Sequence, residues 1–268
     1  LGRLAVGLLQ PDAGIRTWRG QNVDSMSSPQ QKRVRLAVQM IFQDPYASLN
    51  PRMRAVDTVT EAPIQHELIL SRDKKDFAQK LFAKVGLAPE MMDRYPHQFS
   101  GGQRSRLGIA RALAVNPEFL VCDEAVAALD VSIQAQVLNL FMQLRADLDL
   151  TYLFISHDLR VVRHIADDIV VMHQGKIVEQ GPVMDIFRNP KHPYTKSLLA
   201  CRPPLDKRIK RLPVSADFMS TDADGNMLEI PTTVSETINS VIITKEQREA
   251  EHKELYSRSK ILDRKSVV

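Results

Sequence analysis

Three apolar stretches of the chain each end directly at residues with reactive or polar side chains, and this repeat limits the possible folds most. The stretches are "LAVQMIF" (36–42) before Gln43, "FLVC" (119–122) before Asp123 and Glu124, and "TYLFIS" (151–156) before His157. Short apolar runs of this kind are typical of buried strands in a parallel sheet. Helical segments separate them, so the sequence predicts an α/β domain around a mainly parallel sheet.

The segments between these strands have the periodicity of helices. In "DFAQKLFAKVGL" the apolar residues share one face and Gly86 ends the helix, and Ile133 to Leu144 repeats the pattern. We therefore expect residues 46–103 to form a mostly helical insertion into the α/β domain. A further helix is expected over residues 1–9, and hairpins are expected at Arg19-Gly20 and Gln174-Gly175.

Composition excludes several classes of protein. The net charge of +4 is small and the basic residues are interleaved with acids, which argues against a nucleic-acid partner. Two cysteines cannot form a disulfide framework, and no apolar run reaches the roughly 20 residues of a membrane span. After residue 200 the chain becomes basic and proline-rich and then polar, so we expect 201–268 to be a linker or extension, with an exposed helix over 245–258.

Four short motifs carry candidate chemistry, although each has an ordinary structural reading when taken alone. Small residues in "FSGGQ" precede a helix, and open backbone N–H groups at such a start bind anions; the alternative is a plain helix cap. Asp123 fits the role of a Mg²⁺ ligand and Glu124 that of a general base. The alternative for the pair is a solvated acidic turn. A lone His157 or Gln43 at a strand end would indicate nothing specific.

Taken together, these motifs resemble the ATPase of ATP-binding cassette (ABC) transporters. The order and spacing of Gln43, Ser100–Gln103, Asp123-Glu124, Asp130 and His157 match that family over about residues 1–200. "FQDPYASLNPR" and "HPYTKSLLA" look more specifically like the ATPases of peptide, opine and nickel importers. The resemblance implies a P-loop NTPase-type fold, with helices on both faces of the sheet and residues 46–103 as its helical subdomain.

The resemblance also implies a role for each matching residue. Glu124 would be the catalytic carboxylate, His157 the switch histidine at the γ-phosphate, and Gln43 a contact to Mg²⁺ and the attacking water. Asp123 would associate with Mg²⁺. The residues implied to contact ATP across a dimer interface are Ser100, Gly101, Gly102 and Gln103, with Asp130 in the adjoining D-loop.

The sequence departs from the family pattern in several places. Phe99 stands where many cassettes have leucine, and Ala125 and Ala127 replace a frequent proline and serine. No G-x-x-x-x-G-K-[ST] phosphate loop occurs anywhere in the chain. We therefore expect a fragment that lacks the N-terminal strands and the phosphate loop, whose parent continues past 201–268 into a second cassette; the final "DRKSVV" resembles translated adapter sequence.

The resulting hypothesis is an ATP- and Mg²⁺-dependent ATPase subunit of an importer for peptides or similar solutes, inactive as the fragment alone. Its expected partners are a second cassette, membrane permease subunits and, indirectly, a substrate-binding protein, at the cytoplasmic face of the membrane. Two alternatives remain open: a non-transport ABC ATPase of the DNA-repair or translation type, and a degenerate regulatory module. The importer-like motifs argue against the first, and intact Glu124 and His157 argue against the second.

Overall fold

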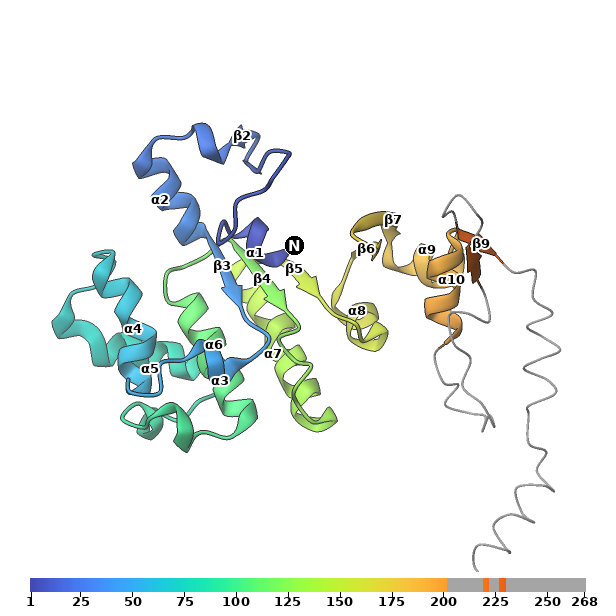
Figure 1. Cartoon of the computed structure of the whole chain (residues 1–268). Helices are drawn as coiled ribbons and strands as arrows, with labels where there is room; N and C mark the ends of the chain where they lie inside the picture. Colours follow the sequence, from blue (N-terminus) through green and yellow to red (C-terminus); the bar gives the residue numbers. More distant parts are fainter. Residues whose placement is uncertain (202–218, 222–226, 230–268) are drawn as a thin grey trace, which may run out of the picture. The chain divides into compact units, whose positions relative to one another are not determined.

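The computed structural model describes residues 1–201, 219–221 and 227–229, and the chain divides into two compact units (Figure 1). The first unit is Leu1–Ala166 and the second begins at Asp167. The helix expected over 245–258 and the final "DRKSVV" lie outside the described residues, as does most of the expected linker.

A three-stranded parallel sheet forms the centre of the first unit. Its strands are β3 (Val38–Ile41), β4 (Phe119–Asp123) and β5 (Thr151–Ile155), in the order β3-β4-β5. Ile41 pairs with Cys122, and Asp123 pairs with Ile155, so all three strands end at one edge. The predicted parallel sheet is confirmed, and the residues that follow the strands lie together at its carboxyl edge.

Helices cover both faces of this sheet, as the resemblance implied. On one face α1 (Gly2–Ala5) approaches so closely that a Cβ on Gly2 would lie 3.1–3.4 Å from Val121, Ile155 and Met40. On the other face α7 (Val131–Leu148) places Phe141 edge-on against the rings of Tyr152 and Phe154.

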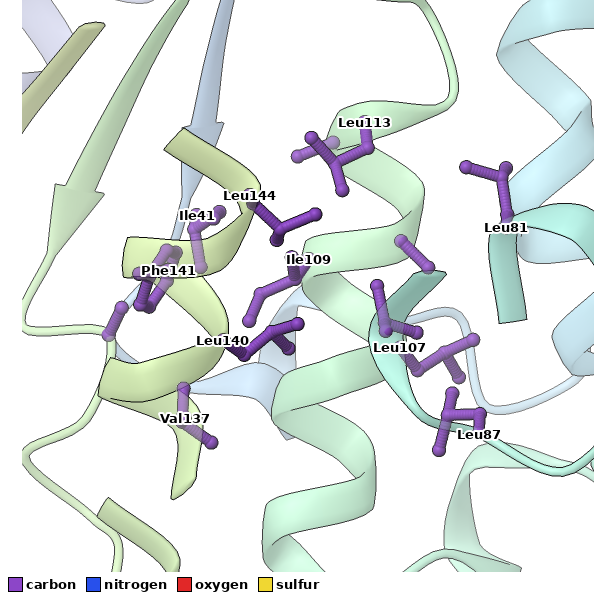
Figure 2. Packing of buried hydrophobic residues seen from close by; sticks show 14 of the residues in the cluster. Ile41, Leu81, Leu87, Leu107, Ile109, Leu113, Val137, Leu140, Phe141 and Leu144 are labelled. Carbon is purple, nitrogen blue, oxygen red and sulfur yellow. The ribbon is translucent and has the colours of Figure 1, made fainter. Parts of the chain in front are cut away.

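Between α7 and the helical region lies α6 (Gly101–Leu113), whose apolar side chains interdigitate with those of α7 (Figure 2). The residues labelled in that core come from the sheet, from α5 to α7 and from the turn after α5: Ile41, Leu81, Leu87, Leu107, Ile109, Leu113, Val137, Leu140, Phe141 and Leu144. One continuous core therefore joins the sheet to the helical region.

The helical region contains α3 (Pro45–Ser48), α4 (Ala55–Gln65) and α5 (Lys74–Val85) before α6. The amphipathic α5 is confirmed, because Leu81, Phe82 and Val85 are buried and Gly86 ends the helix at φ +67°. Short 3-10 turns complete the first unit at Val23–Ser25, Ser71–Asp73, Pro89–Met91 and Pro96–Gln98, and α8 (Leu159–Ile165) is its last helix.

Two expectations near the N-terminus need correction. The helix expected over residues 1–9 is only α1, because the chain turns away at Gly7, whose φ of +80° is left-handed. A helix that the periodicity did not predict, α2 (Ser28–Ala37), takes the first two residues of the expected strand 36–42. The hairpin at Arg19-Gly20 is confirmed, with β1 (Thr17–Trp18) antiparallel to β2 (Gln21–Asn22).

The second unit begins with the expected hairpin at Gln174-Gly175, formed by β6 (Asp168–His173) and β7 (Lys176–Pro182). It continues with α9 (Val183–Arg188), α10 (Pro193–Ala200), β8 (Met219–Thr221) and β9 (Met227–Glu229). Glu179 on β7 accepts hydrogen bonds from the backbone N–H groups of Lys191 and His192, just before α10. Within the part of the chain that is described, no helix is long and apolar enough to cross a membrane.

Candidate catalytic edge of the sheet

The Glu124 carboxylate lies at the centre of the carboxyl edge and is held from both sides. The Gln43 side-chain amide, from the end of β3, donates a hydrogen bond to Oε2. Nδ1 of His157, just beyond β5, lies 3.0 Å from Oε1. Which of the two groups donates in this contact depends on the tautomer of the His157 ring. The structure thus brings together three of the predicted site residues, one from each strand end.

The backbone of Glu124 has an unusual conformation that aims its side chain along this edge. Its φ is +48°, in the left-handed region that residues other than glycine seldom occupy. The N–H of Glu124 donates to the carbonyl of Ile155, and its carbonyl accepts from Ala127, both at 3.0 Å. The next two residues, Ala125 and Val126, are buried. Strain of about 1–3 kcal/mol at such a residue is characteristic of functional sites and is maintained by the packing around it.

Asp123, the last residue of β4, stands beside Glu124 and is half-buried. Asp123, Glu124 and Gln43 carry carboxylate and amide oxygens, which are the ligand types that Mg²⁺ prefers. The neighbouring Cys122 contributes no ligand, because full burial raises the pKa of its thiol and keeps it protonated. The donor chemistry of this edge therefore suits a hard cation.

The segment Ser100–Gln103 begins α6 and caps it. The Ser100 hydroxyl accepts from the N–H of Gln103, and the Gln103 side chain accepts from the N–H of Ser100. The first two N–H groups of the helix, at Gly101 and Gly102, have no carbonyl within the helix to bond. This start of α6 fits an anionic group such as a phosphate.

Gly102 has a packing role that the sequence did not reveal. A Cβ on Gly102 would lie 2.4 Å from Cγ2 of Ile133 on α7, whereas a Cβ on Gly101 would lie 3.9 Å from Leu129. Only Gly102 is therefore required for the close approach of α6 to α7.

Asp130 forms the N-cap of α7, where its carboxylate accepts a hydrogen bond of 3.0 Å from the N–H of Ile133. The structure thus gives Asp130 a capping function within its own helix. Its contact to nucleotide, and the phosphate contact of Ser100–Gln103, remain predictions.

Comparison with known proteins gives two family matches. Residues 1–127 match the family model "ABC transporter", and residues 178–220 match "Oligopeptide/dipeptide transporter, C-terminal region". The second match contains the "HPYTKSLLA" motif that had suggested the importer subgroup.

Curated relatives match most of the chain. It is 48% identical over 213 residues to the oligopeptide transport ATP-binding protein AppF of Bacillus subtilis, covering 78% of this chain and 65% of AppF. It is 47% identical over 223 residues to the dipeptide transport ATP-binding protein DppF of Escherichia coli, covering 82% of this chain and 66% of DppF. The chain thus spans just under two thirds of the length of these relatives.

Solved structures share the fold. The ATP-binding cassette MJ0796, a dimer in a post-hydrolysis state bound to ADP and Pi, matches with a TM-score of 0.59 at 22% identity, covering 68% of this chain and 78% of its own. cbiO1 from Clostridium perfringens, part of an ABC transporter complex, matches with a TM-score of 0.61 at 24% identity, covering 70% and 73%. Fold, motif order and relatives agree with the match of residues 1–127 to the ABC transporter family.

Proposed function

We propose that the chain provides the hydrolytic edge of the ATPase of an ABC importer for peptides. The observation that carries the proposal is the contact of Glu124 with both Gln43 and His157 at the carboxyl edge of the sheet. In this proposal Glu124 accepts a proton from the attacking water, and Gln43 orients that water. His157 contacts the γ-phosphate of the substrate ATP.

Mg²⁺ would be held by Asp123 and Gln43, and when bound it would neutralise charge on the phosphates. Ser100–Gln103 would contact the γ-phosphate of an ATP molecule held by an opposing cassette, with Asp130 beside that interface. The printed sequence contains no G-x-x-x-x-G-K-[ST]. We therefore propose that binding and turnover of ATP need a phosphate loop in addition to these 268 residues.

Peptide import is supported by the names of the relatives and by the match of residues 178–220. The proposed partners are a second cassette and permease subunits at the cytoplasmic face of the membrane, with substrate supplied by a binding protein. A groove of about 410 Å³, lined by residues 67–70 and 73 after α4 and by the first turns of α5, is a candidate permease contact. Its wall includes the exposed Leu68 and Leu70 beside the acidic Asp73 and Asp76.

The test uses the complete gene product reconstituted with its permease. Glu124→Gln should retain ATP binding and lose most turnover, because an amide cannot accept the proton of the water. The matched control is Glu118→Gln, just before β4 at the opposite end of the strand, where Glu118 pairs with Arg19 on the surface. That control should keep turnover. Equal turnover in both variants would contradict the assignment of Glu124.

The need for a phosphate loop has a separate test. Calorimetry on residues 1–268 should detect no specific ATP binding, since several charge-assisted contacts of about 1.5–3 kcal/mol each would be missing. Joining the strand and phosphate loop of a relative to the N-terminus should introduce binding. Tight, Mg²⁺-dependent binding by residues 1–268 alone would refute this part of the proposal.

A further inference from the structure

Arg111 lies on α6, in the helical region, and reaches a backbone group close to the catalytic edge. Its Nη1 donates a hydrogen bond to the carbonyl oxygen of Ser48, the last residue of α3. Burial lowers the pKa of Arg111, and the nearby negative charge of Glu61 opposes that shift. A guanidinium remains charged in proteins, so Arg111 is a half-buried cation bonded to a carbonyl.

This contact lies next to the Gln43–Glu124 pair. A small cavity, with room for about 10 Å³, is lined by Ser48 and Arg111 together with Phe42 and Ala125. Phe42 directly precedes Gln43, and Ala125 directly follows Glu124. Arg111 therefore borders the same small space as the residues adjacent in sequence to Gln43 and Glu124.

The segment that carries Gln43 is fixed at two points. Ile41 pairs with Cys122 in the sheet, and Ser48 is bonded by Arg111. Leu49, directly after Ser48, is buried in the core, so the Arg111 contact adds to packing that already limits the conformations of this segment. With fewer conformations, less entropy opposes a defined position of the Gln43 amide.

We propose that Arg111 is a positioning residue for Gln43: by holding the Ser48 carbonyl on α6, it keeps the Gln43 amide against the Glu124 carboxylate. The consequence for hydrolysis rests on the proposed function, since it needs the roles given there to Gln43 and Glu124. Because α6 begins at Ser100–Gln103, one helix would then connect the proposed phosphate-contacting segment to the residue that orients water.

Arg106 offers a matched control on the same helix. Its Nη1 donates a 2.7 Å hydrogen bond to the carbonyl of Val85 at the end of α5. Arg106→Met and Arg111→Met therefore each remove one arginine–carbonyl contact of α6, but only the second contact involves the segment that follows Gln43.

The readout is the chemical shift of the Gln43 side-chain amide in a ¹H–¹⁵N NMR spectrum of ¹⁵N-labelled residues 1–268. Its signal is identified by its loss in Gln43→Ala. Glu124→Ala should move this signal, which shows that it reports the contact. Arg111→Met should move it in the same direction, whereas Arg106→Met should leave it in place even if both variants unfold at lower temperature. Arg111→Lys, which retains a charge and a donor, should give an intermediate position and serves as the test if Arg111→Met does not fold.

An unchanged Gln43 signal in Arg111→Met, or in Arg111→Lys when only that variant folds, would overturn the inference. A signal that moves equally in Arg106→Met would overturn it too, because the effect would then be general loosening of α6. These results do not depend on turnover. If hydrolysis by the complete gene product proved independent of Glu124, the proposed function would fail while the positioning of Gln43 by Arg111 would stand.

Discussion

Replacing Gly102 with alanine tests the close packing of α6 against α7. The new Cβ would lie 2.4 Å from Cγ2 of Ile133, whereas carbon atoms in contact are normally about 3.5–4.0 Å apart. One of the two helices must therefore move by about 1 Å, or Ile133 must leave its present position.

The expected cost follows from two opposing terms. Overpacking of this kind costs about 1–3 kcal/mol. Alanine is favoured over glycine inside a helix by up to about 1 kcal/mol, although Gly102 lies in the first turn, where the gain is smaller. The net loss of unfolding free energy should be about 1–2 kcal/mol, which corresponds to a decrease in Tm of roughly 2–8 °C for a chain of this size.

Gly108→Ala is the matched control, because Gly108 is buried on the same helix and a Cβ there meets nothing within 4 Å. Thermal unfolding followed by circular dichroism should show stabilisation of about 0.5–1 kcal/mol for Gly108→Ala and destabilisation for Gly102→Ala. Adding Ile133→Ala to Gly102→Ala should recover part of the loss in a double-mutant cycle. The same sign for both glycines, or no coupling to Ile133, would refute the packing argument.

Three further predictions concern other elements. Phe141→Ala should lower the unfolding free energy by about 3–5 kcal/mol in urea titrations, because Phe141 is fully buried between α7 and the sheet; a loss below about 1 kcal/mol would contradict that packing. Asp130→Ala should cost about 1 kcal/mol and Asp130→Asn much less, since asparagine also caps helices; equal losses would argue against the cap. Burial alone would raise the pKa of Glu179, but Thr195 on α10 and the backbone N–H groups before α10 lower it on balance. The contribution of Glu179 to folding stability is therefore complete above the unfolded value near 4.5 and is lost as pH falls through the folded pKa. Hydrogen exchange at Lys191 and His192 should therefore accelerate in acid, and this extra dependence should disappear in Glu179→Gln.

The strand ends were predictable because each apolar run stops at a polar residue, and parallel pairing brings those ends to one edge. The helix α5 was predictable from its buried face and from Gly86. In contrast, α2 buries no residue and so has no apolar periodicity to detect; its sequence signals are the capping pair Ser27 and Gln30.

Sequence reasoning found the residues that meet at the sheet edge. It did not find the packing and hydrogen-bond contacts of the surrounding helices. The requirement for Gly102 depends on Ile133, which is far along the chain, and the contact of Arg111 is to a backbone carbonyl that no motif marks. Such contacts follow from the packing of α6 against α7 and α3. The left-handed φ of Glu124 is equally hidden, because glutamate has no preference for that conformation.

The hairpin of β1 and β2 determines what intrinsic fluorescence can measure in this protein. Trp18 is the chain's single tryptophan and lies at the end of β1, paired with Gln21. Its emission therefore reports the local environment of a two-stranded hairpin, which is a weakly stable element by itself. A denaturation curve followed by Trp18 emission should precede the curve followed by far-UV circular dichroism. Emission would thus monitor early opening near the N-terminus, whereas a tryptophan introduced in α7 would monitor the loss of the core.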